Sequence, residues 1–161
     1  MYEKLIRKIS KARPSDSCTD SFNAETPDYW VFHAPYNKLV QKSYGRLFLA
    51  DARRRRNDNE EKKDGANEPD RQLDPWLAQP TEDTFNDKNL EKILKNLSAK
   101  AFEERFKDSC AASKMVGNTY TASVFLNLAS LVDRVNLTPG KTIWLFSYGS
   151  GALATMYSLS V

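Results

Sequence analysis

The sequence predicts an α/β fold in which helices pack on a mixed sheet and the chain ends in a β-hairpin. Residues 29–32 form a short apolar run that stops just before a histidine and a proline, which is typical of a strand buried on both faces of a sheet. Apolar residues between 84 and 106 recur at helical spacing. Two β-rich runs, 142–148 and 152–161, flank a glycine-containing turn, and this pattern indicates a hairpin.

Length, charge and cysteine content exclude several classes of protein. The 161 residues, of which 40% are apolar, are enough for one domain. The 24 basic and 21 acidic residues nearly balance, so we expect neither a nucleic-acid nor a membrane partner. No long apolar run or signal peptide occurs, which favours a cytoplasmic protein and leaves a mitochondrial one open. Two cysteines and one histidine predict no metal site and no disulfide framework.

The first 50 residues predict a helix, a loop, a strand and a second helix. Residues 2 to about 11 have apolar side chains at helical spacing, so we expect an amphipathic helix that ends before Pro14. The following segment, 13–27, is rich in Ser, Asp, Thr and Pro and is interpreted as a loop that carries Cys18. A strand at 28–33 and a helix from about 35 to 50 complete this part.

His33 lies where the predicted strand ends and the next helix begins. Pro35 is suited to a first helical position, so His33 should lie beside a helix N-terminus, whose partial positive charge favours a neutral imidazole. Lys38, Lys42 and Arg46 follow at intervals of four residues and form a cationic stripe. The sequence thus predicts a proton-transfer group beside an anion-binding helix face. A buried structural histidine and a solvated helix face are the alternatives.

A charged segment follows. Between Asp51 and Asp74, 15 of 24 residues are charged, and Leu73 is the only large apolar residue. Such a segment buries too little apolar surface to offset its ordering entropy, so we expect a disordered insertion from 51 to about 80. The run Arg53 to Arg56 could bind RNA or act as an import signal, but the neighbouring acids favour a solvated loop.

Helical and strand patterns resume after this segment. Residues 84–87 supply capping side chains for a helix of about 20 residues. The small residues 109–113 indicate a covered strand that holds Cys110, and a thiol in such a place is not expected to be a nucleophile.

A turn and a buried helix precede the hairpin. The Gly-Asn pair at 117 and 118 feeds a helix that is apolar almost all round through Leu131, so we expect this helix to be buried on every side. The side chain of Asn118 can orient a carbonyl group or serve only the turn. Ser150 lies between two glycines, where a ligand can approach backbone N–H groups. The hydrolase pattern G-x-S-x-G is absent because position 148 is Tyr.

Three motifs in order resemble the eukaryotic 3-hydroxy-3-methylglutaryl-CoA (HMG-CoA) synthase family. They are Phe-His-Ala-Pro-Tyr-Asn-Lys-Leu-Val-Gln-Lys-Ser at 32–43, Gly-Asn-Thr-Tyr-Thr-Ala-Ser at 117–123 and Leu-Phe-Ser-Tyr-Gly-Ser-Gly-Ala-Leu-Ala-Thr at 145–155. The resemblance implies the C-terminal half of a thiolase-like fold. It also implies condensation of acetyl-CoA with acetoacetyl-CoA, an acyltransferase reaction of the mevalonate and ketone-body pathways that uses CoA thioesters as substrates and no further cofactor. The family resemblance implies a homodimer.

The resemblance assigns roles to five residues. His33 matches the catalytic histidine that polarises acetoacetyl-CoA and exchanges a proton. Lys38 and Lys42 match positions that contact CoA, while Asn118 and Ser150 match residues near the acyl group. The nucleophilic cysteine and catalytic glutamate of the family belong to a preceding half that has no counterpart in these 161 residues. We therefore expect a fragment of an incomplete fold that is inactive alone, or a catalytically dead module that binds CoA or pairs with a synthase.

Overall fold

The computed structural model of the chain describes residues 23–62, 68–149 and 153–161. The helix predicted at 2–11 lies outside the described residues, as do Cys18 and Ser150. The chain divides into two compact units. Of the described residues, one unit contains 23–24, 42–62 and 68–99, and the other contains 25–41, 100–149 and 153–161. Each unit has its own cluster of buried apolar side chains.

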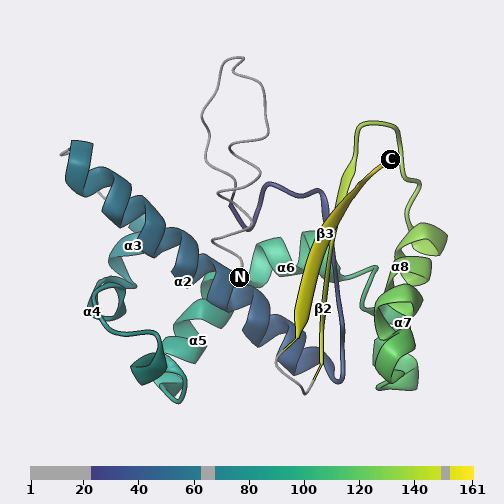
Figure 1. Cartoon of the computed structure of the whole chain (residues 1–161), viewed down its shortest axis with the longest axis horizontal. Helices are drawn as coiled ribbons and strands as arrows, with labels where there is room; N and C mark the ends of the chain where they lie inside the picture. The colour runs from purple at the N-terminus through teal and green to yellow at the C-terminus, as the bar shows by residue number, and fades with distance from the viewer. Residues whose placement is uncertain (1–22, 63–67, 150–152) are drawn as a thin grey trace. The chain divides into compact units, whose positions relative to one another are not determined.

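The second unit is built on a three-stranded mixed sheet (Figure 1). Strand β1 (Tyr29–Phe32) pairs in parallel with β2 (Thr142–Tyr148), and β2 pairs antiparallel with β3 (Ala154–Ser160). The register aligns Phe32 with Phe146, and Thr142 with Ser160. The strand and the hairpin predicted from the apolar runs are therefore confirmed.

Helices cover both faces of this sheet. On one face, α8 (Ser123–Arg134) contributes Val124 and Leu131 to a buried cluster completed by three strand residues, Val31, Ile143 and Leu145. On the other face, Trp30 stacks on Phe106 of α6 (Ala99–Phe106), with ring centroids 6.3 Å apart. Successive strand residues point to opposite faces, so the uninterrupted apolar sequence of β1 serves both layers.

The strand predicted at 109–113 is wrong. These residues form a tight connection and the start of α7 (Ala111–Val116), followed by the short helix η2 (Tyr120–Ala122). Serine side chains that bond to backbone carbonyl groups compete with the hydrogen bonds of a strand. Here Ser109 Oγ donates to Trp30 O at 2.8 Å, and Ser113 Oγ donates to Cys110 O at 3.1 Å.

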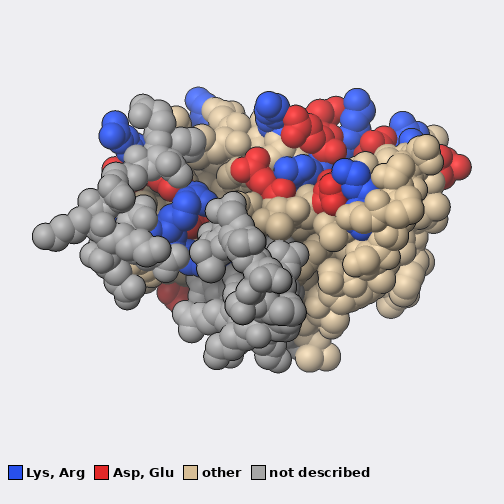
Figure 2. All heavy atoms as spheres, turned by 90° about the horizontal axis from the view of Figure 1, so that it is seen from above, with Lys and Arg blue, Asp and Glu red and all other residues tan. Residues whose placement is uncertain are grey.

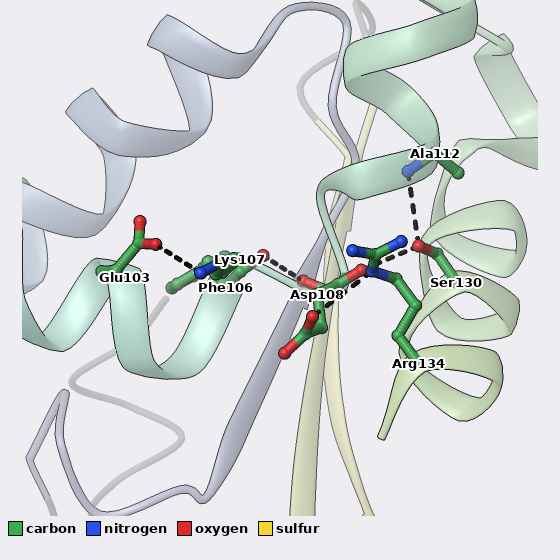
Figure 3. A network of polar contacts seen from close by, with 8 residues as sticks. Glu103, Phe106, Lys107, Asp108, Ala112, Ser130 and Arg134 are labelled. Atoms are coloured by element: carbon green, nitrogen blue, oxygen red, sulfur yellow. Dashed lines mark hydrogen bonds and ion pairs between the residues drawn. The ribbon is translucent and has the colours of Figure 1, made fainter.

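A polar network ties this connection to α8 (Figure 3). Ser130 Oγ donates to Asp108 O at 2.7 Å and accepts from Ala112 N, and Arg134 Nε donates to Asp108 Oδ1 at 3.3 Å. The close-up places Asp108 between α6 and α8, and Lys107, the residue after α6, pairs with Glu103 of α6. The buried Ser130 of α8 is thus satisfied within the unit.

The prediction that α8 is buried on every side is wrong for the described chain. Phe125 is 66% exposed and Val132 is 57% exposed, while Val124 and Leu131 are buried. The helix packs on the sheet through one face only. Because an apolar residue can lie on the surface, the composition of a helix does not by itself decide how many neighbours it has.

The first unit is helical. It contains most of α2 (Asn37–Lys62), together with α3 (Glu68–Arg71), α4 (Asp74–Leu77), the short helix η1 (Glu82–Thr84) and α5 (Lys88–Leu97). Its core consists of small and aliphatic side chains from α2, the α3–α4 connection and α5, namely Leu49, Ala52, Leu73, Leu90 and Leu94.

The disordered insertion predicted at 51 to about 80 is wrong for the described part of that segment. Helix α2 continues through Lys62, and α3 and α4 follow the undescribed residues 63–67. Charged side chains are held by specific partners: Arg55 makes two bonds to the buried carboxylate of Asp70, at 2.8 and 2.7 Å, and Arg53 donates to the carbonyl groups of Trp76 and Gln79. Intramolecular pairing offsets the cost of ordering this charged sequence.

The single helix predicted to start near 84–87 is two helices. Asp87 caps α5 as expected, because its carboxylate accepts from the backbone N–H groups of Asn89 and Leu90. Helix α5 then ends at Leu97, and α6 begins at Ala99 after the single residue Ser98. Leu90 and Leu94 are buried, as the helical spacing predicts.

Candidate active site at the ends of the parallel strands

The two parallel strands β1 and β2 end at the same edge of the sheet. The backbone N–H of His33, the residue after β1, donates to Phe146 O of β2 at 2.8 Å. Tyr148 is the last residue of β2 and Gly149 follows it. In open α/β sheets, ligands bind beyond the carboxyl ends of the parallel strands. This edge is therefore the candidate site, and His33 lies at it.

The imidazole of His33 lies against the ring of Tyr148. The ring centroids are 5.1 Å apart and the rings meet edge to face at 75°. His33 is half-buried, and burial lowers its pKa from the ordinary value of 6.5. Removal from water disfavours the charged imidazolium, so the ring is neutral at pH 7 and offers one N–H donor and one acceptor nitrogen.

The helix after His33 starts later than predicted. Helix α2 begins at Asn37 rather than at Pro35, because residues 35 and 36 form a bend. The bond from Leu39 N to Tyr36 O, at 3.0 Å, closes the turn that leads from this bend into the helix. The predicted neutral state of His33 agrees with the lowered pKa. The cause that the structure gives for the lowered pKa is burial of the imidazole.

Helix α8 bonds to the backbone on both sides of His33. Ala34 N donates to Ser123 Oγ at 2.9 Å, and Asn127 Nδ2 donates to Phe32 O at 3.0 Å. Neither Ser123 nor Asn127 is among the site residues predicted from the sequence, where Ser123 stands only as the last residue of the motif at 117–123. The sequence does contain one pattern that could have indicated them: two polar residues four positions apart in a mostly apolar helix, a spacing that places both on one face.

Tyr148 is a third residue that the sequence did not predict for the site, since it was noted only as a departure from a hydrolase motif. Its hydroxyl group is buried and has no hydrogen-bond partner among the described residues. Burial raises the pKa of Tyr148, so the phenol stays protonated and keeps its O–H donor. An aromatic residue at the end of a strand is too common to have marked it in advance.

The predicted cationic stripe is largely used within the protein. Lys42, which belongs to the first unit, pairs with Glu91 at 2.9 Å. Arg46 donates to Thr84 Oγ1 at 2.9 Å and to Thr84 O at 2.7 Å. Lys38 lies in the first turn of α2, in the same unit as His33, and is exposed without an ion pair to any described residue. Of the three, Lys38 is the one whose charge is open to a ligand.

Asn118 lies in the turn between α7 and η2 and is exposed. Its Oδ1 accepts from Tyr120 N at 2.8 Å, so the side chain does serve the turn. Gly117 and Tyr120 take the positive φ angles of this turn, 80° and 52°. The bond to Tyr120 occupies the acceptor oxygen of Asn118, which leaves the amide N–H groups as its donors to a ligand carbonyl.

The turn after β2 is only partly described, because Ser150 lies outside the described residues. Gly149 N donates to Leu153 O at 3.0 Å. The hairpin therefore uses the N–H group of Gly149, while the N–H group of Ser150, which we expect a ligand to approach, lies outside the described residues.

The structure also describes Cys110, the groups that could bind a metal ion, the length of the helices and the surface charge. Cys110 is fully buried, and burial raises its pKa to about 11, so it holds no thiolate at neutral pH. In the described ranges, no three side chains of the types His, Cys, Asp and Glu are grouped to hold a metal ion. No described helix is long and apolar enough to span a membrane. Basic and acidic side chains are interspersed on the face seen in Figure 2.

Comparison with known proteins identifies one family. A family model described as hydroxymethylglutaryl-coenzyme A synthase C terminal matches residues 1–161. The cytoplasmic hydroxymethylglutaryl-CoA synthase of Rattus norvegicus is 37% identical over 163 residues, which cover 100% of this chain and 30% of the rat protein. Hydroxymethylglutaryl-CoA synthase erg13B of Aspergillus fumigatus is 37% identical over 178 residues, which cover 96% of this chain and 34% of the fungal protein.

A solved structure agrees with these relatives. MvaS in complex with 3-hydroxy-3-methylglutaryl coenzyme A superposes with a TM-score of 0.60 at 26% identity, covering 99% of this chain and 31% of that chain. The likeness confirms the mixed α/β, thiolase-like fold class. The chain spans about a third of the length of the relatives it matches.

Proposed function

Because the chain belongs to the hydroxymethylglutaryl-CoA synthase C-terminal family, we propose that it carries the part of a synthase site that binds acetoacetyl-CoA and holds a proton-transfer group beside it. The observation that carries the proposal is the position of His33 at the shared end of the parallel strands, half-buried and with a lowered pKa. The full reaction is the condensation of acetyl-CoA with acetoacetyl-CoA to HMG-CoA and free CoA.

His33 is the group that would act on the acyl chain. A neutral imidazole donates a hydrogen bond through one ring nitrogen to the ketone oxygen of acetoacetyl-CoA, where negative charge develops as the new carbon–carbon bond forms. The edge-to-face contact with Tyr148 limits the rotation of the ring. Asn118 would donate to the thioester carbonyl through its free amide hydrogens, and Ser150 would border the same group.

The phosphate groups of CoA are negatively charged and bind cationic side chains. We propose Lys38 for this role, because it is exposed and has no ion pair to a described residue. Lys42 is a weaker candidate, because its ammonium group already pairs with Glu91 and would have to exchange that partner for a phosphate. The site needs no metal ion and no cofactor beyond the CoA thioesters.

The nucleophile and the catalytic carboxylate of the condensation are not assigned to this chain. Cys110 is excluded as the acyl acceptor by its burial and its pKa of about 11. We therefore infer that the 161 residues bind the substrate but do not catalyse condensation alone. The cytoplasmic relatives support a cytoplasmic location. A homodimeric assembly is proposed on the resemblance alone.

A calorimetric titration of the chain with acetoacetyl-CoA and with free CoA tests the proposal. We expect Lys38→Glu to weaken both affinities by about tenfold, because the substitution replaces an attraction to phosphate by a repulsion. Lys100→Glu is the matched control, since Lys100 is an exposed lysine on α6 that pairs only loosely with Glu104, at 4.0 Å. Equal affinities of the unaltered chain and Lys38→Glu would contradict the proposal.

A binding module without chemistry is the second candidate, and the inert Cys110 favours it. Mixing the chain with the part of the rat synthase that lies outside the matched 30%, and adding acetyl-CoA and acetoacetyl-CoA, separates the two. Release of free CoA, detected by a thiol reagent, from the mixture and not from either part alone would show that the chain completes a synthase site. Binding of acetoacetyl-CoA without any release of CoA from the mixture would support the module.

A further inference from the structure

The two peptide groups that flank His33 are each held by helix α8. Asn127 Nδ2 donates to Phe32 O at 3.0 Å, and Ala34 N donates to Ser123 Oγ at 2.9 Å. A third bond, from His33 N to Phe146 O at 2.8 Å, holds the same backbone from β2.

These three bonds determine the direction of the His33 side chain. Peptide groups are planar, so the φ and ψ angles of a residue are set by the orientation of the peptide plane on either side of it. The plane before His33 is held at both of its polar atoms, by Asn127 and by Phe146. The plane after His33 is held at Ala34 N. With both planes held, the Cα–Cβ bond of His33 has one direction.

The residues that make these bonds are unusual for their surroundings. Ser123 is 1% exposed and Asn127 is 0% exposed, in a helix whose other buried side chains are mostly apolar. Burying an amide costs free energy unless its groups are hydrogen-bonded, and Asn127 Oδ1 has no partner among the described residues. The amide is thus retained at a cost, and the bond it does make is the one to Phe32 O.

We propose that Ser123 and Asn127, four residues apart on one face of α8, are positioning residues that hold the backbone around His33 so that its imidazole faces the substrate at the end of the parallel strands. They touch neither substrate nor imidazole and act through the peptide groups on either side of His33. The proposal deepens the proposed function, on which its binding test rests.

The state of His33 can be followed directly, because it is the only histidine in the chain. Its imidazole carbon–proton signal in a two-dimensional NMR spectrum needs no assignment. We expect Ser123→Ala and Asn127→Leu to shift or broaden this signal, because a released backbone lets the ring sample several orientations. Ser123→Thr keeps a hydroxyl group at the same place and should restore the original signal.

Ser130→Ala is the matched control. Ser130 is a buried serine of the same helix, and its hydroxyl group makes two bonds, to Asp108 O and Ala112 N, that do not involve His33. The control should lose stability to a similar degree and leave the His33 signal unchanged. If Ser130→Ala moved the His33 signal as much as Ser123→Ala and Asn127→Leu do, the positioning role would be overturned in favour of general stabilisation. Unchanged His33 signals in Ser123→Ala and Asn127→Leu would also overturn it.

Binding supplies a second measurement. We expect Ser123→Ala to weaken acetoacetyl-CoA binding by about tenfold and to leave free CoA affinity within about twofold, since only the acyl group meets His33. An equal loss for both ligands would contradict the positioning role. If the unaltered chain bound neither ligand, the proposed function would fail, and the NMR comparison would still decide whether α8 positions His33. Should Asn127→Leu fail to fold, Ser123→Ala carries both measurements.

Discussion

The imidazole of His33 and the phenol ring of Tyr148 meet edge to face, with ring centroids 5.1 Å apart and an angle of 75° between the planes. The contact joins the ends of two parallel strands that are more than a hundred residues apart in the sequence. Phe146 stacks on Tyr148 at 5.7 Å and meets Phe32 at 5.2 Å, so the pair continues an aromatic cluster of the sheet. This cluster therefore shields part of the His33 ring from water.

Protonation of His33 should make the stability of the chain depend on pH. Burial lowers the pKa of His33 below 6.5 in the folded state, so between the two pKa values the unfolded chain binds more protons. The free energy of unfolding should therefore fall as the pH drops below about 6.5 and level off below the folded pKa. Urea unfolding of the original chain and His33→Gln at several pH values measures this. A slope that persists in His33→Gln would show that another group is responsible.

Two replacements of Tyr148 should distinguish the effect of its ring from the effect of its hydroxyl group. Tyr148→Phe removes a buried hydroxyl without a described partner and should leave the chain at least as stable. Tyr148→Leu removes the aromatic contacts and should cost about 1–2 kcal/mol. It should also return the pKa of His33 towards its ordinary value, because the imidazole becomes more hydrated. An NMR titration of the single histidine provides the second readout, and an unchanged pKa in Tyr148→Leu would contradict the assigned role of this ring.

Loss of Arg55 should destabilise the first unit. Arg55→Ala leaves the buried carboxylate of Asp70 without its bidentate partner, which should cost about 1–3 kcal/mol in urea unfolding. The double variant Arg55→Leu with Asp70→Leu should recover much of that loss, since an apolar pair needs no hydrogen bonds. Arg56→Ala, at an exposed position of the same run, is the control. RNA binding lost in Arg55→Ala at unchanged stability would instead restore the nucleic-acid hypothesis.

Cys110 should be unreactive in the folded chain. Its thiol is buried and its pKa is raised to about 11, so alkylation by iodoacetamide near pH 8 should be at least about tenfold slower than in urea. Peptide mapping by mass spectrometry distinguishes Cys110 from Cys18. Rapid modification of Cys110 under native conditions, or transfer of an acetyl group to it from acetyl-CoA, would make it a candidate nucleophile after all.

Local patterns were sufficient where neighbouring residues decide the structure. The apolar run 29–32, the hairpin at the end of the chain and the capping carboxylate of Asp87 all follow from short-range preferences. The charged segment from residue 51 was misjudged for the opposite reason. Arg53 donates to Trp76 O and Gln79 O, and Arg55 donates to Asp70. No composition rule shows which acid or carbonyl group will lie within reach of a guanidinium group.

By itself, the sequence determined the family, the sheet strands and the identity of the histidine at the end of β1, since these depend on motifs and on the order of residues along the chain. Tertiary structure alone decided what surrounds that histidine. The contact of His33 with Tyr148, and the bonds from Ser123 and Asn127 to its flanking peptide groups, join segments 89 residues or more apart. Only the parallel pairing of β1 with β2 and the packing of α8 on the sheet bring these groups within bonding distance.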